Sequence, residues 1–300
     1  MAIQAKISEV LIPEISRFYG SRYAILDFPN YLNPGDSAIW MGTRAILETL
    51  LGCAPSYVST IKQFDERQCH QEIGRGPVFF LGGGNFGDLY QKHNQRRLGV
   101  LKNIQHNPTV FLPFSIANSS IDVGNGVSEI HSALSDHCNT IFFTREQRTF
   151  ETFSRNFGRD SILCPDLAHF ITPLNGSKRG SALSLFREDA ERYGHSRREH
   201  TTDWAELPKM KLTNRLGKLT SLVPPGKSRL RLYDMLAAQK TRIAMRAIGS
   251  SCHLTTDRLH GIILASEMKI PVDAYDNATG KVLSYVATWK DYLGEVTPKS

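Results

Sequence analysis

Short runs of apolar, β-branched and aromatic residues recur along this chain, and most are followed by a polar loop and then by a helical pattern. Such runs occupy residues 22–28, 77–83, 108–115, 139–145 and 161–166. Apolar residues at helical spacing fill 37–52 and 146–158, and a glycine ends each of these segments. Strands that alternate with helices predict an α/β fold, in which helices cover both faces of a parallel sheet.

A second series begins near residue 175, after proline, asparagine, glycine and charged residues gather in 171–180. Its predicted strands are 181–189, 252–256 and 271–276, and its predicted helices are 228–250, a segment from 262 and 280–289. The polar stretch from Arg192 to Lys227 predicts a long surface excursion with one short helix. Because 300 residues exceed one ordinary core, we predict two α/β domains, 1–175 and 176–300, and the last helix can pack back on the first.

Composition excludes several classes of protein. With 41% hydrophobic and 22% charged residues, the chain is typical of a soluble globular protein. No apolar run reaches the ~18 residues that span a bilayer, and the N-terminus lacks the apolar block of a signal peptide. The five cysteines are scattered and form no CxxC pair, which argues against a disulfide framework and a thiolate metal site. We expect a reduced, cytoplasmic protein.

The net charge of +7 marks the chain as basic. Much of this charge lies between Arg192 and Arg231. Such a surface attracts nucleic acid, anionic lipid or phosphorylated substrates without choosing among them. A solvated basic loop is the simplest interpretation, and attraction to a membrane surface or to a polyanionic acceptor is the alternative.

The loop NYLNPGDSAIWMG carries Asn33, Gly35 and Asp36 just before a predicted helix. In doubly wound sheets, ligands bind beyond the carboxyl ends of the strands, where this loop is expected. Asp36 or Ser37 can cap the helix by accepting its free N–H groups. The functional alternative is a carboxylate that faces a hydroxylated substrate.

The loop LGGGNFGDLY at 81–90 holds four glycines in six positions, which lets backbone approach a ligand closely. It matches neither GxGxxG nor GxxxxGK[ST], so dinucleotide and P-loop functions are weakly supported. A simple turn is the alternative to a site. The pair Gly87-Asp88 repeats the pair Gly35-Asp36, which favours a functional loop.

Arg258 and His260 stand where a strand gives way to an apolar helix, in TTDRLHGIILASEMKIPV. A helix N-terminus carries partial positive charge and free N–H donors, so a cation there is unfavourable unless an anion binds. An arginine, a histidine and a helix N-terminus together form a good receptor for phosphate or carboxylate. A structural histidine is the alternative, and Asp257 can cap the helix or orient Arg258.

Together these motifs resemble those of the polysaccharide pyruvyl transferase family. The segments that carry the resemblance stand in family order between residues 22 and 289: NPGDSAIWMG, FLGGGNFGDLY, LPFSI, FTREQRTFE, PDLAHF, SLFRED, TTDRLHGIILASEMKIPV and YDNATGKV. The resemblance implies two Rossmann-like domains that face each other across a cleft, as in GT-B glycosyltransferases. It also implies transfer of a pyruvyl group from phosphoenolpyruvate to a sugar of an exopolysaccharide or cell-surface glycan, usually as a cyclic ketal, with release of phosphate.

The resemblance also implies roles for single residues. In this family the arginine and histidine of an R-L-H motif contact the donor, which gives that role to Arg258 and His260, and Arg187 of SLFRED fits the place of a further donor-binding arginine. Many relatives have DNSYGK where this chain has DNATGK, so a contact of that tyrosine is not carried over. Lys281 of this segment is a further candidate for donor binding.

The chemistry of the side chains suggests a role in the reaction for each candidate residue. We assign proton transfer to His260, because histidine titrates near neutral pH, with phosphate binding as its alternative role. Asp36 and Asp88 are the candidates for positioning or deprotonating acceptor hydroxyls. The remaining acceptor-side or loop-binding candidates are Asn33, Gly35, Gly83, Gly84 and Asn85. No cofactor is expected, and no His/Cys/Asp cluster has the spacing of metal ligands.

Two other functions stay open. A nucleotide-sugar glycosyltransferase would share the two-domain plan and a basic cleft but would bind a nucleotide diphosphate. A non-enzymatic polyanion-binding protein would explain the charge but not the Gly-Asp loops. Nucleic acid is not expected as a partner, because the aromatic stacking motifs of RNA-binding modules are missing. The expected partners are phosphoenolpyruvate and a glycan, taken to be lipid-linked at the inner membrane surface.

Overall fold

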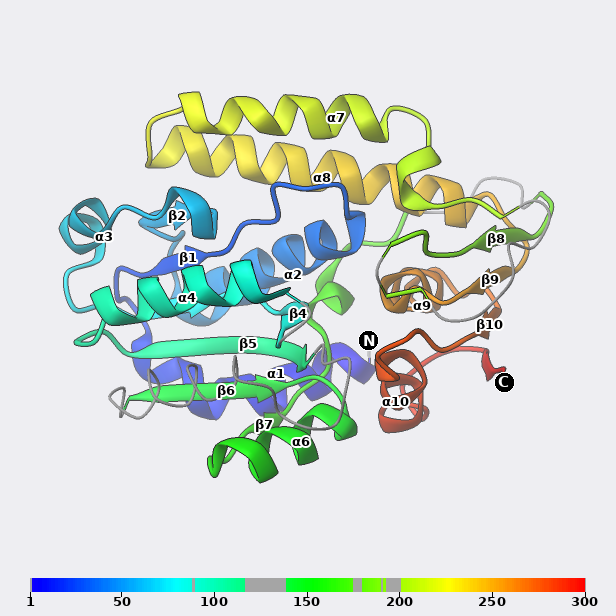
Figure 1. Ribbon diagram of the computed structural model, residues 1–300, viewed down its shortest axis with the longest axis horizontal. Helices are drawn as coiled ribbons and strands as arrows, with labels where there is room; N and C mark the ends of the chain where they lie inside the picture. The colour runs from blue at the N-terminus through cyan, green and yellow to red at the C-terminus, as the bar shows by residue number, and fades with distance from the viewer. Residues whose placement is uncertain are drawn as a thin grey trace.

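The computed structural model describes residues 2–87, 90–116, 139–174, 180–189, 191–192 and 201–299 (Figure 1). Two parallel sheets form its frame. The first has seven strands in the order β2-β1-β3-β5-β6-β7, with β4 beside β5. The second has four strands in the order β11-β10-β9-β8. The α/β fold with parallel sheets that the alternation of strands and helices predicts is confirmed.

The strands of the first sheet are β1 (Ala24–Leu26), β2 (Tyr57–Ser59), β3 (Val78–Phe80), β4 (Gly83–Phe86), β5 (Thr109–Ile116), β6 (Thr140–Thr144) and β7 (Ile162–Leu163). Those of the second are β8 (Leu183–Leu185), β9 (Leu254–Thr256), β10 (Val272–Ala274) and β11 (Val296–Pro298). The helices are α1 (Ala2–Ile15), α2 (Pro34–Leu51), α3 (Glu66–Ile73), α4 (Gln91–Asn103), α6 (Gln147–Phe157), α7 (Met210–Gly217), α8 (Lys227–Gly249), α9 (Leu259–Glu267) and α10 (Lys281–Thr288).

Alternate residues of the central strands enter two different hydrophobic clusters. On β3, Phe79 belongs to the cluster that includes α1, α2, α8 and α9, whereas Val78 and Phe80 face the cluster that includes α3, α4 and α6. This is the two-residue period of a strand whose two faces are both covered. The first cluster continues into the second sheet through Leu254 of β9 and Val272 of β10.

Several elements went unpredicted because their signals are short or mixed with polar residues. Helix α1 buries Ile3, Ile7, Leu11 and Ile15 at a spacing of four. Helices α3 and α4 are mostly polar, and strands β2 and β11 have three residues each. The short helix expected in the polar stretch is α7, and the boundary expected after residue 175 lies outside the described residues.

Helix α8 belongs to the second half of the chain and runs alongside both sheets (Figure 1). Its Tyr233 stacks on Phe28 with ring centroids 3.7 Å apart, and its Asp234 accepts a hydrogen bond from the indole of Trp40 on α2 at 2.8 Å. Helix α10 is bound to the start of α6 by two bonds from backbone N–H groups, Gln147 to Thr288 and Arg148 to Ser284. Both helices therefore join the halves of the chain.

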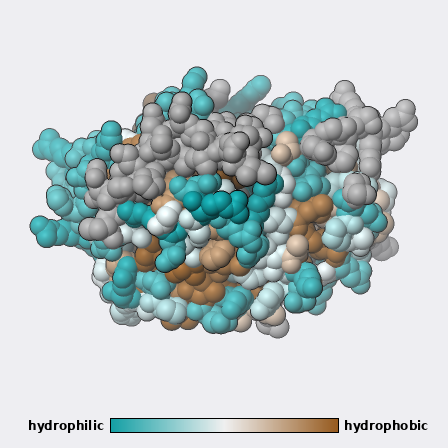
Figure 2. Space-filling model, turned by 60° about the horizontal axis from the view of Figure 1, so that its bottom comes forward, coloured by the Kyte–Doolittle hydropathy of each residue, from teal (hydrophilic) through white to brown (hydrophobic). Residues whose placement is uncertain are grey.

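On the face turned to the viewer in Figure 2, hydrophobic residues gather in two separate patches among hydrophilic ones. Within the described part of the chain, no helix combines the length and apolar character that crossing a bilayer requires.

Candidate active site

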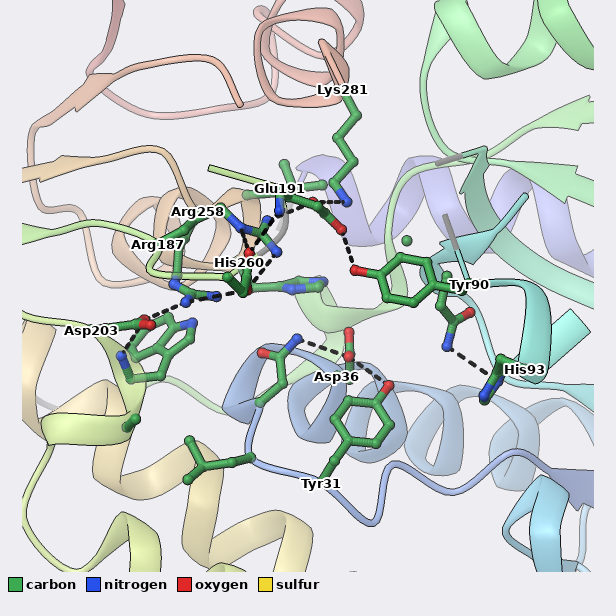
Figure 3. A pocket seen from close by; sticks show the side chains of 18 of the residues that line it. Tyr31, Asp36, Tyr90, His93, Arg187, Glu191, Asp203, Arg258, His260 and Lys281 are labelled. Carbon is green, nitrogen blue, oxygen red and sulfur yellow. Dashed lines mark hydrogen bonds and ion pairs between the residues drawn. The ribbon is translucent and has the colours of Figure 1, made fainter. Parts of the chain in front are cut away.

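A cavity of about 530 Å³ lies between the two halves of the chain (Figure 3). Its lining combines residues from both halves of the chain, including Asp36 and Tyr90 from the first and Arg258 and Lys281 from the second. This volume lies in the range of small-molecule sites. The cavity is therefore the candidate active site.

The polar lining follows from strand direction. Because parallel strands end at the same edge of a sheet, the residues just after them are brought together. In the first sheet Asn33 follows β1, Gly84 lies in β4 shortly after β3, and Arg145 directly follows β6. In the second sheet Arg187 follows β8 and Arg258 follows β9.

Each cation that lines the cavity from the second half of the chain is held by carboxylates. Arg187 contacts Asp189 at 2.8 Å and Glu191 at 2.7 Å, and Lys281 contacts Glu191 at 2.5 Å. Arg258 forms a short ion pair with Asp203. The Nε atom of Arg258 is buried and has no hydrogen-bond partner among the described residues. Because Arg258 also lines the cavity, this unsatisfied N–H group makes it a candidate for binding an anion.

Arg145, Asp166 and His260 form a buried group that joins the halves of the chain. The Arg145 guanidinium donates to Asp166 and to the Ser115 hydroxyl, both at 2.6 Å. The Nε2 atom of His260 lies 3.4 Å from the same Asp166 oxygen and 3.5 Å from Nη1 of Arg145. Burial alone would raise the pKa of Asp166, but His260 and Arg145 outweigh it and hold that pKa well below its usual range. Asp166 is therefore an ionised carboxylate that can orient the imidazole.

Glu191 and Lys281 form a second buried pair. Burial raises the pKa of Glu191, but Lys281 and Arg187 lower it more, and its net shift is downward. Burial lowers the pKa of Lys281, and the charges of Arg187 and Arg145 add to this despite the contact with Glu191. Tyr90 donates to Glu191 at 2.7 Å from the first half of the chain, so this bond crosses the cavity (Figure 3).

Three helices begin at the cavity. Asn33 is the N-cap of α2, Arg258 is the N-cap of α9, and Lys281 is the first residue of α10. Each N-terminus contributes free N–H donors and partial positive charge. Among the described lining residues, four cations (Arg145, Arg187, Arg258 and Lys281) face four carboxylates (Asp36, Asp189, Glu191 and Asp203). Because the formal charges of these side chains balance, the partial positive charges of the helix N-termini favour the binding of an anion.

Two expected caps are corrected. Asn33, not Asp36 or Ser37, caps α2 by accepting from the Gly35 N–H at 3.0 Å, because its side chain stands at the N-cap position itself. Asp257 caps no helix. It accepts the backbone N–H of Arg187 at 3.0 Å, while α9 has no side-chain cap.

Because Asp36 does not cap α2, its carboxylate is available at the cavity wall. It accepts from the Tyr31 hydroxyl at 2.7 Å and from the Asn33 amide at 2.8 Å (Figure 3). Figure 3 shows Tyr31 and Asp36 on the side of the cavity opposite Lys281. Asn33, Asp36 and Tyr31 therefore present hydrogen-bonding groups to a ligand from the first half of the chain.

Two of the predicted glycines are required by close packing. A Cβ at Gly35 would lie 2.2 Å from Nδ1 of His260, and one at Gly84 would lie 2.6 Å from Nζ of Lys281 and 3.0 Å from Nη2 of Arg145. Gly83 has a φ of 122°, a backbone conformation that favours glycine. These glycines make room for the functional side chains.

The structure brings most of the predicted site residues into one place. The lining includes Asn33, Asp36, Gly84, Asn85, Arg187, Arg258, His260 and Lys281. Gly35 lies behind the His260 ring, and Gly83 lies beside Asp36. Asp88 lies outside the described residues.

Sequence reasoning missed several residues of the site. They are Tyr31, Tyr90, Arg145, Asp166, Asp189, Glu191, Asp203 and Trp204. A signal existed for Arg145 and Asp166, because each is the last residue of a predicted strand, 139–145 and 161–166. In the described part of the chain, no group of three or more His, Cys, Asp or Glu side chains is arranged to hold a metal ion.

Comparison with known proteins gives consistent matches. The family model described as "Polysaccharide pyruvyl transferase" matches residues 33–277. The putative pyruvyl transferase EpsO of Bacillus subtilis is 28% identical over 97% of this chain and 91% of its own length. Pyruvyl transferase 1 of Schizosaccharomyces pombe is 24% identical over 89% of this chain and 69% of its own length. A crystal structure of an uncharacterised protein from Klebsiella pneumoniae aligns with a TM-score of 0.65 at 17% identity, covering 98% of each chain, which shows a shared fold.

Proposed function

Because this chain belongs to the polysaccharide pyruvyl transferase family, we propose that it transfers a pyruvyl group from phosphoenolpyruvate to a sugar of an exopolysaccharide or cell-surface glycan. The product is a pyruvate ketal, and phosphate is released. The observation that carries the proposal is the convergence of Arg187, Arg258, His260 and Lys281 in one cavity.

Phosphoenolpyruvate carries a phosphate and a carboxylate, and both need cationic or N–H donors. Arg258 supports this role because its buried Nε has no partner among the described residues. Arg187 donates to both Asp189 and Glu191, and Lys281 donates to Glu191, which leaves further N–H groups of both side chains for a ligand. Arg145 joins them from the first half of the chain. The N-terminus of α9 adds partial positive charge.

The acceptor binds, in this proposal, against the first half of the chain. Asp36 and Asn33 offer an acceptor and an amide to sugar hydroxyls, and Asn85 lines the same wall. Trp204 also lines the cavity, and the Arg258 guanidinium lies over its buried ring, 6.0 Å from the ring centroid. Asp36 is the candidate for deprotonating the attacking hydroxyl.

The reaction balances without a redox partner. The methylene carbon of the donor gains a proton from His260, which makes the neighbouring carbon electrophilic. One sugar hydroxyl attacks that carbon, the bond from it to the phosphate oxygen breaks, and a second hydroxyl closes the ketal. Of the two hydroxyl protons, one replaces the proton given by His260 and the other leaves on phosphate. Asp166 keeps the His260 ring in place through its contact with Nε2.

We further propose that the two sheets are the two Rossmann-like domains of a GT-B-like enzyme, divided near residue 175, with the acceptor on the first and the donor on the second. The proposed acceptor is a lipid-linked repeat unit, handled at the cytoplasmic side of the inner membrane. No cofactor takes part in the proposed reaction.

A thermal-shift screen with phosphoenolpyruvate, UDP and RNA tests the proposal. A ligand that binds only the folded state stabilises it by about 2.7 kcal/mol at a hundredfold excess over its Kd. We expect stabilisation by phosphoenolpyruvate alone, followed by phosphate release when a glycan acceptor is added. A shift with UDP and none with phosphoenolpyruvate would instead indicate a nucleotide-sugar glycosyltransferase, and a shift with RNA alone a polyanion-binding protein.

A further inference from the structure

Helix α7 presents leucines to solvent on its outer side. Its buried side holds Met210, Thr213 and Gly217. On the opposite side, Leu212 is 58% exposed and Leu216 is 46% exposed. Leu222, at the end of the 3₁₀ helix Lys218–Leu222, is 76% exposed. These large apolar side chains therefore leave about half or more of their surface in water.

Cations surround these leucines. Residues 207–233 contain seven lysines and arginines and no aspartate or glutamate. Lys211 and Arg215 share the exposed side of α7 with Leu212 and Leu216, and Lys227 and Arg231 are exposed one turn apart on α8. Asp234, the next carboxylate, is turned to Trp40 and Arg44. The α7–α8 face, defined by these exposed leucines and cations, is therefore both apolar and positively charged.

We propose that the α7–α8 face docks on an anionic lipid bilayer. Surfaces that interleave lysine and arginine with exposed leucine bind such bilayers, because the cations pair with anionic headgroups while the apolar side chains enter the acyl boundary. A soluble polyanion such as RNA would match the charge but leave the leucines in water. The face lies on the outside of the molecule, where α7 and α8 run side by side (Figure 1).

The position of this face links it to the cavity. Trp204 lines the cavity and precedes α7 by only a few residues. Lys240 of α8 donates to the backbone oxygen of Tyr31, a cavity residue, at 2.7 Å and to Asn214 of α7 at 3.3 Å. The docked protein would therefore hold its cavity near the membrane surface. The benefit of holding the cavity there rests on the proposed function, because a lipid-linked acceptor is anchored in that membrane.

Sedimentation with vesicles tests the inference. We expect binding to phosphatidylglycerol-containing vesicles, weak binding to pure phosphatidylcholine, and loss of binding at high salt. Each membrane-facing cation is worth about 1 kcal/mol, or roughly fivefold. The triple variant Lys211→Gln/Arg215→Gln/Arg231→Gln should bind roughly a hundredfold more weakly. The matched control Arg75→Gln/Lys102→Gln/Lys290→Gln removes three exposed cations elsewhere and should bind as the parent does.

A second variant, Leu212→Ser/Leu216→Ser/Leu222→Ser, distinguishes binding to a bilayer from binding to a soluble polyanion. Its affinity for the vesicles should fall at least about tenfold. An affinity equal to that of the parent would overturn the inference. Control Tyr19→Ser removes a residue that is 73% exposed elsewhere and should have no effect. Thermal melts check that each variant is folded. Transfer to a water-soluble oligosaccharide keeps the two proposals apart: activity without vesicle binding refutes docking alone, and vesicle binding without activity refutes the proposed function alone.

Discussion

Substitution of Gly35 by alanine tests whether the place of the His260 ring controls the reaction. The new Cβ would lie 2.2 Å from Nδ1 and 2.4 Å from Cγ of His260. Ordinary contact begins at 3.4 Å, so the ring must move by at least 1.2 Å, the difference between the two distances. Helix α2 cannot retreat easily, because a Cβ position at Gly42 already lies 1.7 Å from the backbone oxygen of Leu167.

A misplacement of about 1 Å in a catalytic group can cost roughly 10²-fold in rate. We therefore expect Gly35→Ala to lower kcat about a hundredfold, measured as phosphate release at saturating donor and acceptor. Overpacking should also cost about 1–3 kcal/mol of unfolding free energy. The control is Gly99→Ala in α4, where no atom lies within 4 Å of the new Cβ. It should gain roughly 0.5–1 kcal/mol from helix propensity and keep its activity.

A double-mutant cycle isolates the clash. A His260→Gly background removes the ring and also its Cβ, which would lie 2.5 Å from the new Cβ at Gly35, so adding Gly35→Ala should no longer destabilise the protein. The reasoning is refuted if Gly35→Ala costs the same unfolding free energy in both backgrounds, or if the single variant keeps the parental kcat.

Three further predictions concern the charged groups of the site. Arg258→Lys should raise the apparent donor Kd at least about tenfold despite its kept charge, because an ammonium cannot replace a planar guanidinium with two aligned N–H groups; isothermal titration would contradict this if the affinity stayed within twofold. His260→Gln should lose roughly 10²–10⁴-fold in kcat at saturating donor if the imidazole transfers the proton, whereas a rise in KM alone would assign it to phosphate binding. Burial raises the pKa of Asp257 to about 6 although Arg187 and Arg258 oppose it, so the folded state favours the protonated acid. Ionised Asp257 therefore lowers the free energy of unfolding. This cost is absent below the unfolded pKa of 3.8 and complete above pH 6. The stability of Asp257→Asn relative to the parent should therefore grow by roughly 2 kcal/mol between pH 4.5 and 7.5 in denaturant titrations, and a constant difference would show that Asp257 does not titrate in this window.

The R-L-H junction shows how much of the site can be predicted from sequence. A cation at a helix N-terminus is unfavourable alone, so Arg258 and His260 indicate an anion site without any structure. Glu191 gives no such signal, because its contacts with Tyr90 and Lys281 lie about 100 residues away on either side. Local pattern reports on local structure, and a carboxylate that bridges distant segments leaves no trace in it.

The fold shows the same contrast between elements with a clear local pattern and elements without one. The buried strands β3 and β5 are apolar runs that single out a parallel sheet, and both were predictable. Helix α4 was not, because its stripe of Leu98 and Leu101 is broken by cations, one of which, Arg97, is itself buried against Asp27. A buried ion pair replaces apolar residues on the inner face of that helix, which hides the helical period.

Asp189 has a consequence for turnover in the proposed reaction. Its carboxylate holds the Arg187 guanidinium at 2.8 Å and lies 3.6 Å from Arg258, yet its side chain is 47% exposed. A donor anion that binds these arginines competes with this tethered carboxylate for their N–H groups. After transfer, the same carboxylate competes with phosphate for the arginines at the high effective concentration of an attached group. An internal competitor of this kind shortens the time that product phosphate spends on the enzyme, at the expense of some donor affinity.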